Sequence, residues 1–195
     1  MSKNRTEAFS DGVIAILITI MVLELRAPEG AEPAALRPLI PVFLSYVLSF
    51  IYLGIYWNNH HHLFQVVERV DGRVLWANLH LLFWLSLISF VTAWMGENGF
   101  ETWPLALYGV VLLMAAIAYH LLTRALLAVH AADSPLAQAL SQNIKERISL
   151  IIFLVAIPLA FVRPWLSGGL YVLVAIMWFI PDRRMEKVVA EASRW

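Results

Sequence analysis

The feature that most constrains this chain is a membrane-length apolar segment that begins with charged residues. Residues 12–23 contain a single polar side chain, Thr19. The tripeptide Phe9-Ser10-Asp11 stands directly before them, and Arg5 precedes Asp11 by about one and a half helical turns. A carboxylate at the mouth of such a helix is costly in a membrane, so it usually has a partner and a function. The segment therefore indicates a membrane protein whose first helix is functional.

The composition supports the same class. Of the 195 residues, 61% are hydrophobic and 14% are charged, whereas soluble domains carry about 25% charged residues. The formal net charge is zero, which argues against a nucleic-acid partner. The chain has no cysteine, so it has no disulfide, thiolate ligand or redox thiol.

Six segments are apolar enough to be membrane-spanning helices, which need roughly 20 residues each, although the last two are short. Turn-forming residues such as Asp71-Gly72 and Arg163-Pro164 separate them. We therefore predict an all-α integral membrane bundle, formed by a single six-helix domain over residues 1–195. The predicted helices are residues 7–25, 39–59, 74–95, 103–122, 148–162 and 164–180.

The distribution of lysine and arginine orients this bundle. With the N-terminus in the cytoplasm, three basic residues lie outside, namely Arg26, Arg37 and Arg163. Eleven lie on the cytoplasmic side, which is the side that carries the excess of basic residues in membrane proteins. We therefore expect both termini in the cytoplasm of a multi-pass protein of the inner (plasma) membrane, in contact with lipids. The eleven are Lys3, Arg5, Arg69, Arg73, Arg124, Lys145, Arg147, Arg183, Arg184, Lys187 and Arg194.

The first predicted helix has two faces when its residues are placed at 100° intervals. A stripe about 100° wide holds Gly12, Ile16, Thr19, Ile20 and Leu23, and Asp11 points away from its centre. By spacing alone, the stripe fits ordinary helix packing or lipid contact. It also fits the wall of a pore, because a narrow apolar ring makes an ion shed its water. Shedding water costs less for potassium than for sodium, so such a ring could favour potassium although the chain has no TVGYG filter.

Polar side chains at the cytoplasmic ends of the second and third spans are the candidates to meet Asp11. A buried carboxylate needs a cation or several hydrogen-bond donors. We therefore expect a network of hydrogen bonds that locks the helices together, with Trp57, Asn78 and His80 among its members. The run His60-His61-His62 is also compatible with a proton relay or a metal site. Adjacent helical residues point 100° apart and cannot all reach one ion, so we predict no metal site.

Two other functions compete with a channel at this point. A proton-coupled transporter would use Asp11 and the cytoplasmic-side histidines. A haem- or metal-dependent membrane enzyme would use His60, His61, His62, His80 and His120. No H-E-x-x-H, G-x-S-x-G or phosphate-loop motif is present, so we predict that the protein is not an enzyme and needs no cofactor.

The start of the chain resembles a known family. Arg5, Phe9, Ser10 and Asp11 form the motif R-x-x-x-F-S-D, which apolar residues 12–16 follow. This pattern is similar to the first helix of the bacterial branch of the transmembrane protein 175 family, which includes the endosomal and lysosomal potassium channels of animals. Residues 76–79, 85–87 and 92–96 in the third span are also similar to that family. The resemblance is strongest over residues 5–96.

The resemblance implies a potassium-permeable channel that conducts passively and assembles as a homotetramer, with monovalent cations as its permeant ions. The first helix would line the central pore, with Ile16 at the constriction, Ile20 and Leu23 as further apolar rings, and Thr19 as a hydroxyl ring.

The resemblance also implies a structural role for the motif, which would clamp the first helix to the second and third without touching the ion. Its residues are Arg5, Phe9, Ser10 and Asp11, with Trp57, Asn78 and His80 as partners. Proton-coupled transport through Asp11 and the histidines is the alternative function.

Overall fold

The computed structural model describes residues 3–131, 134–140 and 144–179. These residues form helices and connecting loops without any strand, which confirms the predicted all-α fold. In chain order the elements are α1 (Lys3–Leu23), the 3₁₀ helix η1 (Pro33–Leu39), α2 (Ile40–Gln65), α3 (Gly72–Glu97), α4 (Thr102–Ala128), α5 (Pro135–Leu140), α6 (Ile144–Ala160) and α7 (Pro164–Phe179).

Local sequence sets several helix ends. The Asp71 carboxylate caps α3 by accepting a 2.9 Å hydrogen bond from the Val74 N–H. The turn after α3 passes through left-handed backbone at Gly99 and Phe100, whose φ angles are 57° and 63°. Pro164 begins α7, where its missing N–H costs no helical hydrogen bond.

The helices extend beyond the predicted spans mainly where polar residues follow the apolar core. α2 continues from the predicted end at Asn59 to Gln65, so the three histidines lie on the helix. α4 continues from Leu122 to Ala128, and α6 begins at Ile144 and not at 148. Hydropathy marks the part of a helix that suits hydrocarbon, whereas backbone hydrogen bonding continues until a turn interrupts it. Residues 180–195 of the predicted domain lie outside the described residues, so the predicted last position of the sixth helix does too.

Length and composition distinguish the helices. Four segments of the described chain are long and apolar enough to cross a membrane: α1, η1 together with α2, α3 and α4. α7 is apolar but shorter, and α6 has 17 residues with Lys145, Glu146 and Arg147 in its first turn.

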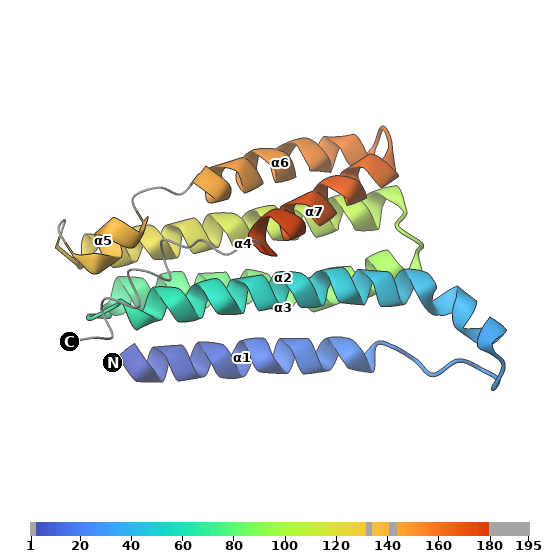
Figure 1. Ribbon diagram of the computed structural model, residues 1–195, viewed down its shortest axis with the longest axis horizontal. Coiled ribbons are helices and arrows are strands. Elements are labelled where there is room, and N and C mark those ends of the chain that lie inside the picture. Colours follow the sequence, from blue (N-terminus) through green and yellow to red (C-terminus); the bar gives the residue numbers. More distant parts are fainter. Residues whose placement is uncertain (1–2, 132–133, 141–143, 180–195) are drawn as a thin grey trace.

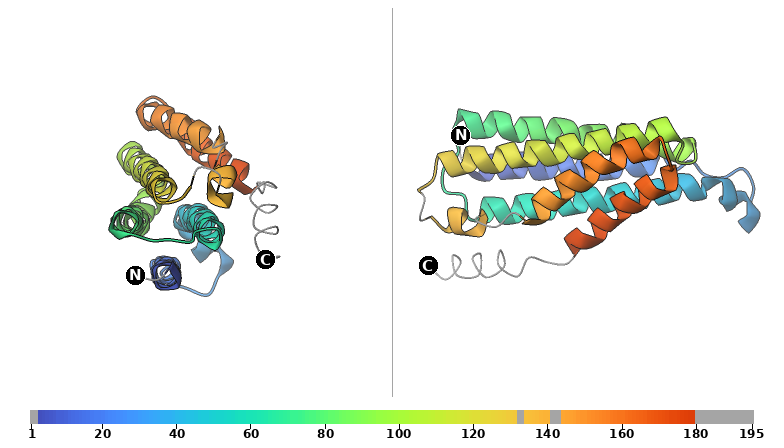
Figure 2. Two further views of the ribbon diagram at one scale, coloured as in Figure 1. Left: turned by 90° about the vertical axis from the view of Figure 1, so that its left-hand side faces the viewer. Right: turned by 90° about the horizontal axis from the view of Figure 1, so that it is seen from above.

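α1 lies at one edge of the bundle. Figure 1 shows it beside α2 and α3, with α4 beyond them and the α6–α7 hairpin on the far side. The end-on view in Figure 2 shows the same order, with α1 outside the group formed by the other long helices. Because α1 packs against α2 and α3, much of its circumference faces away from the chain.

The alternating helix directions sort the basic residues. The start of α1, the end of α2, the start of α3 and the end of α4 lie at one end of the bundle, near α5 (Figure 1). Seven of the basic residues predicted to be cytoplasmic belong to this end: Lys3, Arg5, Arg69, Arg73, Arg124, Lys145 and Arg147. The other four lie outside the described residues. Arg26, Arg37 and Arg163 belong to the opposite end, so the structure separates the two groups as the sequence analysis did.

A glycine lets α4 and α7 approach closely. A Cβ on Gly109 would overlap the Tyr171 hydroxyl and would lie 2.8 Å from Tyr171 Cζ. Tyr171 is fully buried, its hydroxyl donates to the Leu105 carbonyl at 3.3 Å, and its own carbonyl accepts from the Tyr52 hydroxyl at 2.7 Å. The tyrosine therefore ties α7 to both α4 and α2.

Candidate pore-lining helix and its clamp

One face of α1 packs against the rest of the chain. Its buried residues recur every three or four positions, as expected for one side of an α-helix. They are Thr6, Ser10, Ile14, Leu17 and Met21. The polar members lie in the first turns and the apolar members follow, so hydrogen bonds hold one end of α1 and apolar packing holds the rest.

The predicted pore residues lie on the exposed side of α1. Ile16 is 56% exposed, Ile20 43% and Leu23 77%. Thr19 is exposed among them, and its hydroxyl donates to the Ile16 carbonyl at 2.9 Å. Because that bond uses the hydroxyl hydrogen, the oxygen lone pairs of Thr19 remain available to accept from water or to contact a cation. The face is thus apolar with one hydroxyl oxygen.

Asn78 of α3 connects α1 to α2 in the interior. Its Nδ2 donates to Ser10 Oγ at 2.9 Å, and its Oδ1 lies 2.9 Å from His60 Nε2. Ser10 Oγ donates to the Thr6 carbonyl at 2.9 Å, so it can only accept from Asn78. The amide orientation of Asn78 follows, and with it the tautomer of His60, which must carry a proton on Nε2. Since His60, Asn78 and Ser10 are all buried, the chain of bonds is shielded from water.

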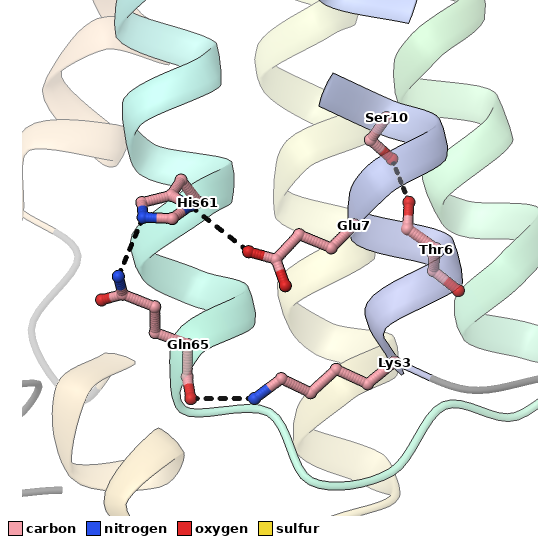
Figure 3. Close-up of polar contacts among 6 residues, drawn as sticks. All are labelled: Lys3, Thr6, Glu7, Ser10, His61 and Gln65. Atoms are coloured by element: carbon pink, nitrogen blue, oxygen red, sulfur yellow. Dashed lines mark hydrogen bonds and ion pairs between the residues drawn. The ribbon is translucent and has the colours of Figure 1, made fainter. Parts of the chain in front are cut away.

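A second group of contacts joins the first turns of α1 to the last turn of α2 (Figure 3). Glu7 Oε1 lies 3.3 Å from His61 Nδ1, and Gln65 Nε2 donates to His61 Nε2 at 2.8 Å. Lys3 Nζ donates to the Gln65 carbonyl at 3.0 Å. These side chains are partly exposed, and exposed ion pairs contribute about 0–1 kcal/mol. The group therefore orients α1 more than it stabilises it.

The structure brings together two of the seven predicted clamp residues, Ser10 and Asn78. Arg5 and Phe9 are exposed on the same side of α1 as Ile16. Trp57 is exposed and stacks on His61, with ring centroids 5.7 Å apart. His80 Nε2 accepts from Trp84 Nε1 at 2.9 Å within α3. The clamping roles of Arg5, Phe9, Trp57 and His80 stay predictions.

The three consecutive histidines have different surroundings. His60 points into the interior and stacks on Phe64, with centroids 4.4 Å apart, while His61 points to α1. Sequence reasoning missed the contacts of Lys3, Glu7 and Gln65. The spacing of Lys3, Glu7 and Asp11 at i, i+4 and i+8 places them along one side of α1 and was the available signal.

Three buried polar atoms of the clamp have no hydrogen-bond partner in the described part of the chain, namely Thr6 Oγ1, Asp11 Oδ1 and His60 Nδ1. An unpaired buried polar group costs about 1–3 kcal/mol, so such atoms are uncommon. Asp11 lies near enough to His60 to interact with it electrostatically. Because His60 carries its proton on Nε2, its Nδ1 presents a lone pair, and no hydrogen bond joins this atom to Asp11 among the described residues.

No group of three or more histidine, aspartate or glutamate side chains is placed to bind a metal within residues 3–131, 134–140 and 144–179. At the histidine run the side chains of His60 and His61 point in different directions, His60 to Asn78 and His61 to Glu7, so they cannot bind one ion together.

The chain is similar to several known proteins. Residues 5–88 match the family described as endosomal/lysosomal potassium channel TMEM175. The chain is 53% identical over 191 residues to a protein of Chryseobacterium sp. named potassium channel. This match covers 98% of this chain and 100% of that protein. It is 27% identical over 195 residues to a zebrafish (Danio rerio) protein named endosomal/lysosomal proton channel TMEM175. This match covers 92% of this chain and 36% of the fish protein.

The fold is also similar to a solved structure. The crystal structure of a lysosomal potassium-selective channel TMEM175 homolog from Chamaesiphon minutus superposes with a TM-score of 0.79. The two chains are 31% identical, and the match covers 91% of this chain and 96% of that one. The similarity thus spans nearly the whole bundle, including the helices for which the sequence resemblance was weak.

Proposed function

Because this chain belongs to the TMEM175 family of potassium channels, we propose that it conducts potassium ions passively across a membrane, as a multi-pass protein that is not an enzyme and needs no cofactor. The observation that carries the pore assignment is the exposed face of α1. It combines Ile16, Ile20 and Leu23 with the hydroxyl of Thr19, on the helix at the edge of the bundle.

The exposed face of α1 differs from the lipid-like faces elsewhere in the chain. α6 and α7 expose bulky aliphatic side chains such as Ile151, Leu154 and Ile176. The outer side of α1 also exposes bulky aliphatic side chains, but it adds the small residues Gly12 and Ala15 and the hydroxyl of Thr19, and small residues let transmembrane helices approach one another. A homotetramer in which four copies of α1 surround an axis would bury this face and use its hydroxyls.

Selectivity in this pore arises from dehydration. A ring of four Ile16 side chains would offer no oxygen to replace the water of an ion, so passage would require the ion to shed water. Potassium loses water at lower cost than sodium, and the Thr19 oxygens one turn further along would recoordinate it.

The clamp keeps this ring in place. The bonds among Ser10, Asn78 and His60 fix the rotation of α1 about its own axis, because a rotation of one residue position would move Ser10 by 100°. We infer that the end of the bundle with seven described basic residues faces the cytoplasm of an inner (plasma) membrane, as the positive-inside rule requires.

A flux assay in liposomes tests the pore. We expect Ile16→Asn to increase potassium flux and to reduce the preference for potassium over sodium, because an amide ring hydrates the constriction. Val22→Asn is the matched control, since Val22 is 45% exposed but lies about 120° from Ile16 around the helix. Equal effects of both substitutions, or no effect of Ile16→Asn, would remove Ile16 from the constriction.

A second candidate function is proton movement through Asp11 and the cytoplasmic-side histidines. It is favoured by the unpaired buried atoms Asp11 Oδ1 and His60 Nδ1 and by the zebrafish relative named a proton channel. A proton-coupled transporter would show saturable uptake with a fixed number of protons per substrate. A channel would show uncoupled flux, and a proton-permeable channel would acidify liposomes in the absence of any other substrate.

A further inference from the structure

One histidine holds the loop between α2 and α3 to the end of α4. The loop covers residues 66–71 and belongs to no helix. His130 follows the end of α4, and its Nε2 accepts from the Glu68 N–H at 3.0 Å and from the Arg69 N–H at 3.3 Å. These two N–H groups have no other acceptor in the described part of the chain. His130 therefore supplies their hydrogen bonds and ties the loop to α4.

The hydrogen bonds of His130 fix its protonation state. Its Nδ1 lies 2.7 Å from the Leu126 carbonyl oxygen, which can only accept, so Nδ1 carries the proton. Its Nε2 faces two backbone N–H groups, which can only donate, so Nε2 presents a lone pair. The ring is therefore neutral in this arrangement. A protonated ring turns a third N–H toward the two donors and loses both bonds to the loop.

Protons can reach this ring, because His130 is only partly buried. Histidine is the side chain that ordinarily changes charge between pH 5 and 8. The charged side chains on the segments that meet His130 are Glu68, Arg69 and Asp71 of the loop and Arg124 of α4, and α5 has none. All four are exposed, and none of them forms an ion pair with another described residue. No ion pair among these groups therefore offsets the hydrogen bonds that protonation breaks.

The same loop joins the two helix ends that hold α1. At its start, the Gln65 carbonyl accepts from Lys3 Nζ of α1 at 3.0 Å (Figure 3). At its end, the Asp71 carboxylate caps α3, the helix that carries the clamp residue bonded to α1. The first half of the loop is anchored by apolar packing, since Val67 is 1% exposed. His130 holds the second half, so its contact stiffens the segment that connects both supports of the candidate pore helix.

From these contacts we propose that His130 is a pH-sensitive switch at this end of the bundle. When the pH falls, protonation of the ring releases loop residues 68–70 from α4, and the ends of α2 and α3 that hold α1 gain freedom to move. The consequence for potassium conduction rests on the proposed function. The release of the loop does not, because it follows from the hydrogen bonds of a single chain.

Amide hydrogen exchange of the purified full chain tests the switch. Protection of residues 68–70 is compared at about pH 7.5 and about pH 5.5, on either side of the range in which histidine titrates, after correction for the intrinsic exchange rate. We expect the wild type to lose protection about tenfold at the lower pH, which is the factor that one hydrogen bond can supply.

Three variants separate the charge of the ring from its shape. His130→Gln can accept through Oε1 and donate through Nε2 without titrating, so its protection should be the same at both pH values. His130→Ala should lack the protection at both. His62→Gln is the matched control, because His62 is also partly buried and makes no hydrogen bond with the described residues. It should keep the pH dependence of the wild type.

Two results overturn the switch: equal protection of the wild type at both pH values, or the same pH dependence in His130→Gln as in the wild type. If neither His130 variant folds, nuclear magnetic resonance of the wild type follows the imidazole and the loop amides together. A loop that opens while the His130 ring is still neutral also overturns the proposal.

Potassium and sodium fluxes through liposomes, with the same pH on both sides, test the consequence for the pore. We expect the preference for potassium over sodium to fall at the lower pH in the wild type and to stay constant in His130→Gln. A preference that does not follow the opening of the loop overturns the link to α1. An absence of potassium flux at both pH values overturns the proposed function instead, and the exchange measurement still decides the switch.

Discussion

Replacing Asn78 with leucine should loosen α1 from the bundle while preserving the shape of the side chain. Asn78 makes two buried hydrogen bonds, to Ser10 Oγ and to His60 Nε2, each of 2.9 Å. After the substitution, the His60 Nε2–H is buried without an acceptor, which costs about 1–3 kcal/mol. Ser10 Oγ loses the hydrogen bond that it accepts from Asn78 but still donates to the Thr6 carbonyl. Such a loss costs about 0.5–1 kcal/mol.

These terms add to about 1.5–4 kcal/mol in the free energy of unfolding, which corresponds to roughly 3–16 °C in the midpoint temperature of a chain of this size. Hydrogen bonds between membrane helices average about 0.6 kcal/mol, so a total above the sum of two such bonds would reveal the cost of the orphaned imidazole. Unfolding of the purified protein, followed by fluorescence and by size-exclusion chromatography, measures the shift.

Two further variants isolate the effect. Asn58→Leu makes the same chemical change at an exposed position on α2 and should leave the midpoint within about 1 °C of the wild type. Ser10→Ala combined with Asn78→Leu completes a double-mutant cycle, whose coupling energy reports the bond between the two residues. If Asn78→Leu were as stable as Asn58→Leu, apolar packing of Ile14, Leu17 and Met21 alone would hold α1, and the clamp would have no energetic role.

Three other predictions concern the pore face, the motif aspartate and the core. Thr19→Val should lower potassium flux without changing the oligomer, because the Thr19 hydroxyl bonds only within its own helix; unchanged flux would exclude the hydroxyl from ion contact. Asp11→Ala should reduce the fraction of the proposed tetramer on size-exclusion more than the selectivity of the remaining channels, since the motif aspartate is expected to hold helices together and not to touch the ion. An intact tetramer with altered selectivity would contradict that assignment. Gly109→Ala should destabilise the protein by about 1–3 kcal/mol because its Cβ displaces the buried Tyr171. Gly54→Ala, where a Cβ meets no atom within 4 Å, should not destabilise it, and equal melting points would refute the close approach.

Apolar periodicity made much of α1 predictable. The 3.6-residue repeat separates Ile16, Thr19, Ile20 and Leu23 from Ser10, Ile14 and Leu17 before any coordinates are known, and the structure places the first group on the exposed side. Hydropathy likewise located the helices, although it placed the end of α2 at residue 59 and not at Gln65. Both signals are local, because they depend on neighbours within a few turns.

The contacts between helices depended on the tertiary structure. Ser10 and Asn78 are 68 positions apart, and their bond requires α1 and α3 to be adjacent and correctly rotated. Glu146 illustrates the same limit: between Lys145 and Arg147 it looks like one charge in a solvated run, and only the packing of α6 against α4 buries it beside His120. Sequence therefore determined where the helices lie and which residues share one face of α1, because both are properties of the helix itself. The fold decided which polar groups meet, because that depends on the positions of several helices at once.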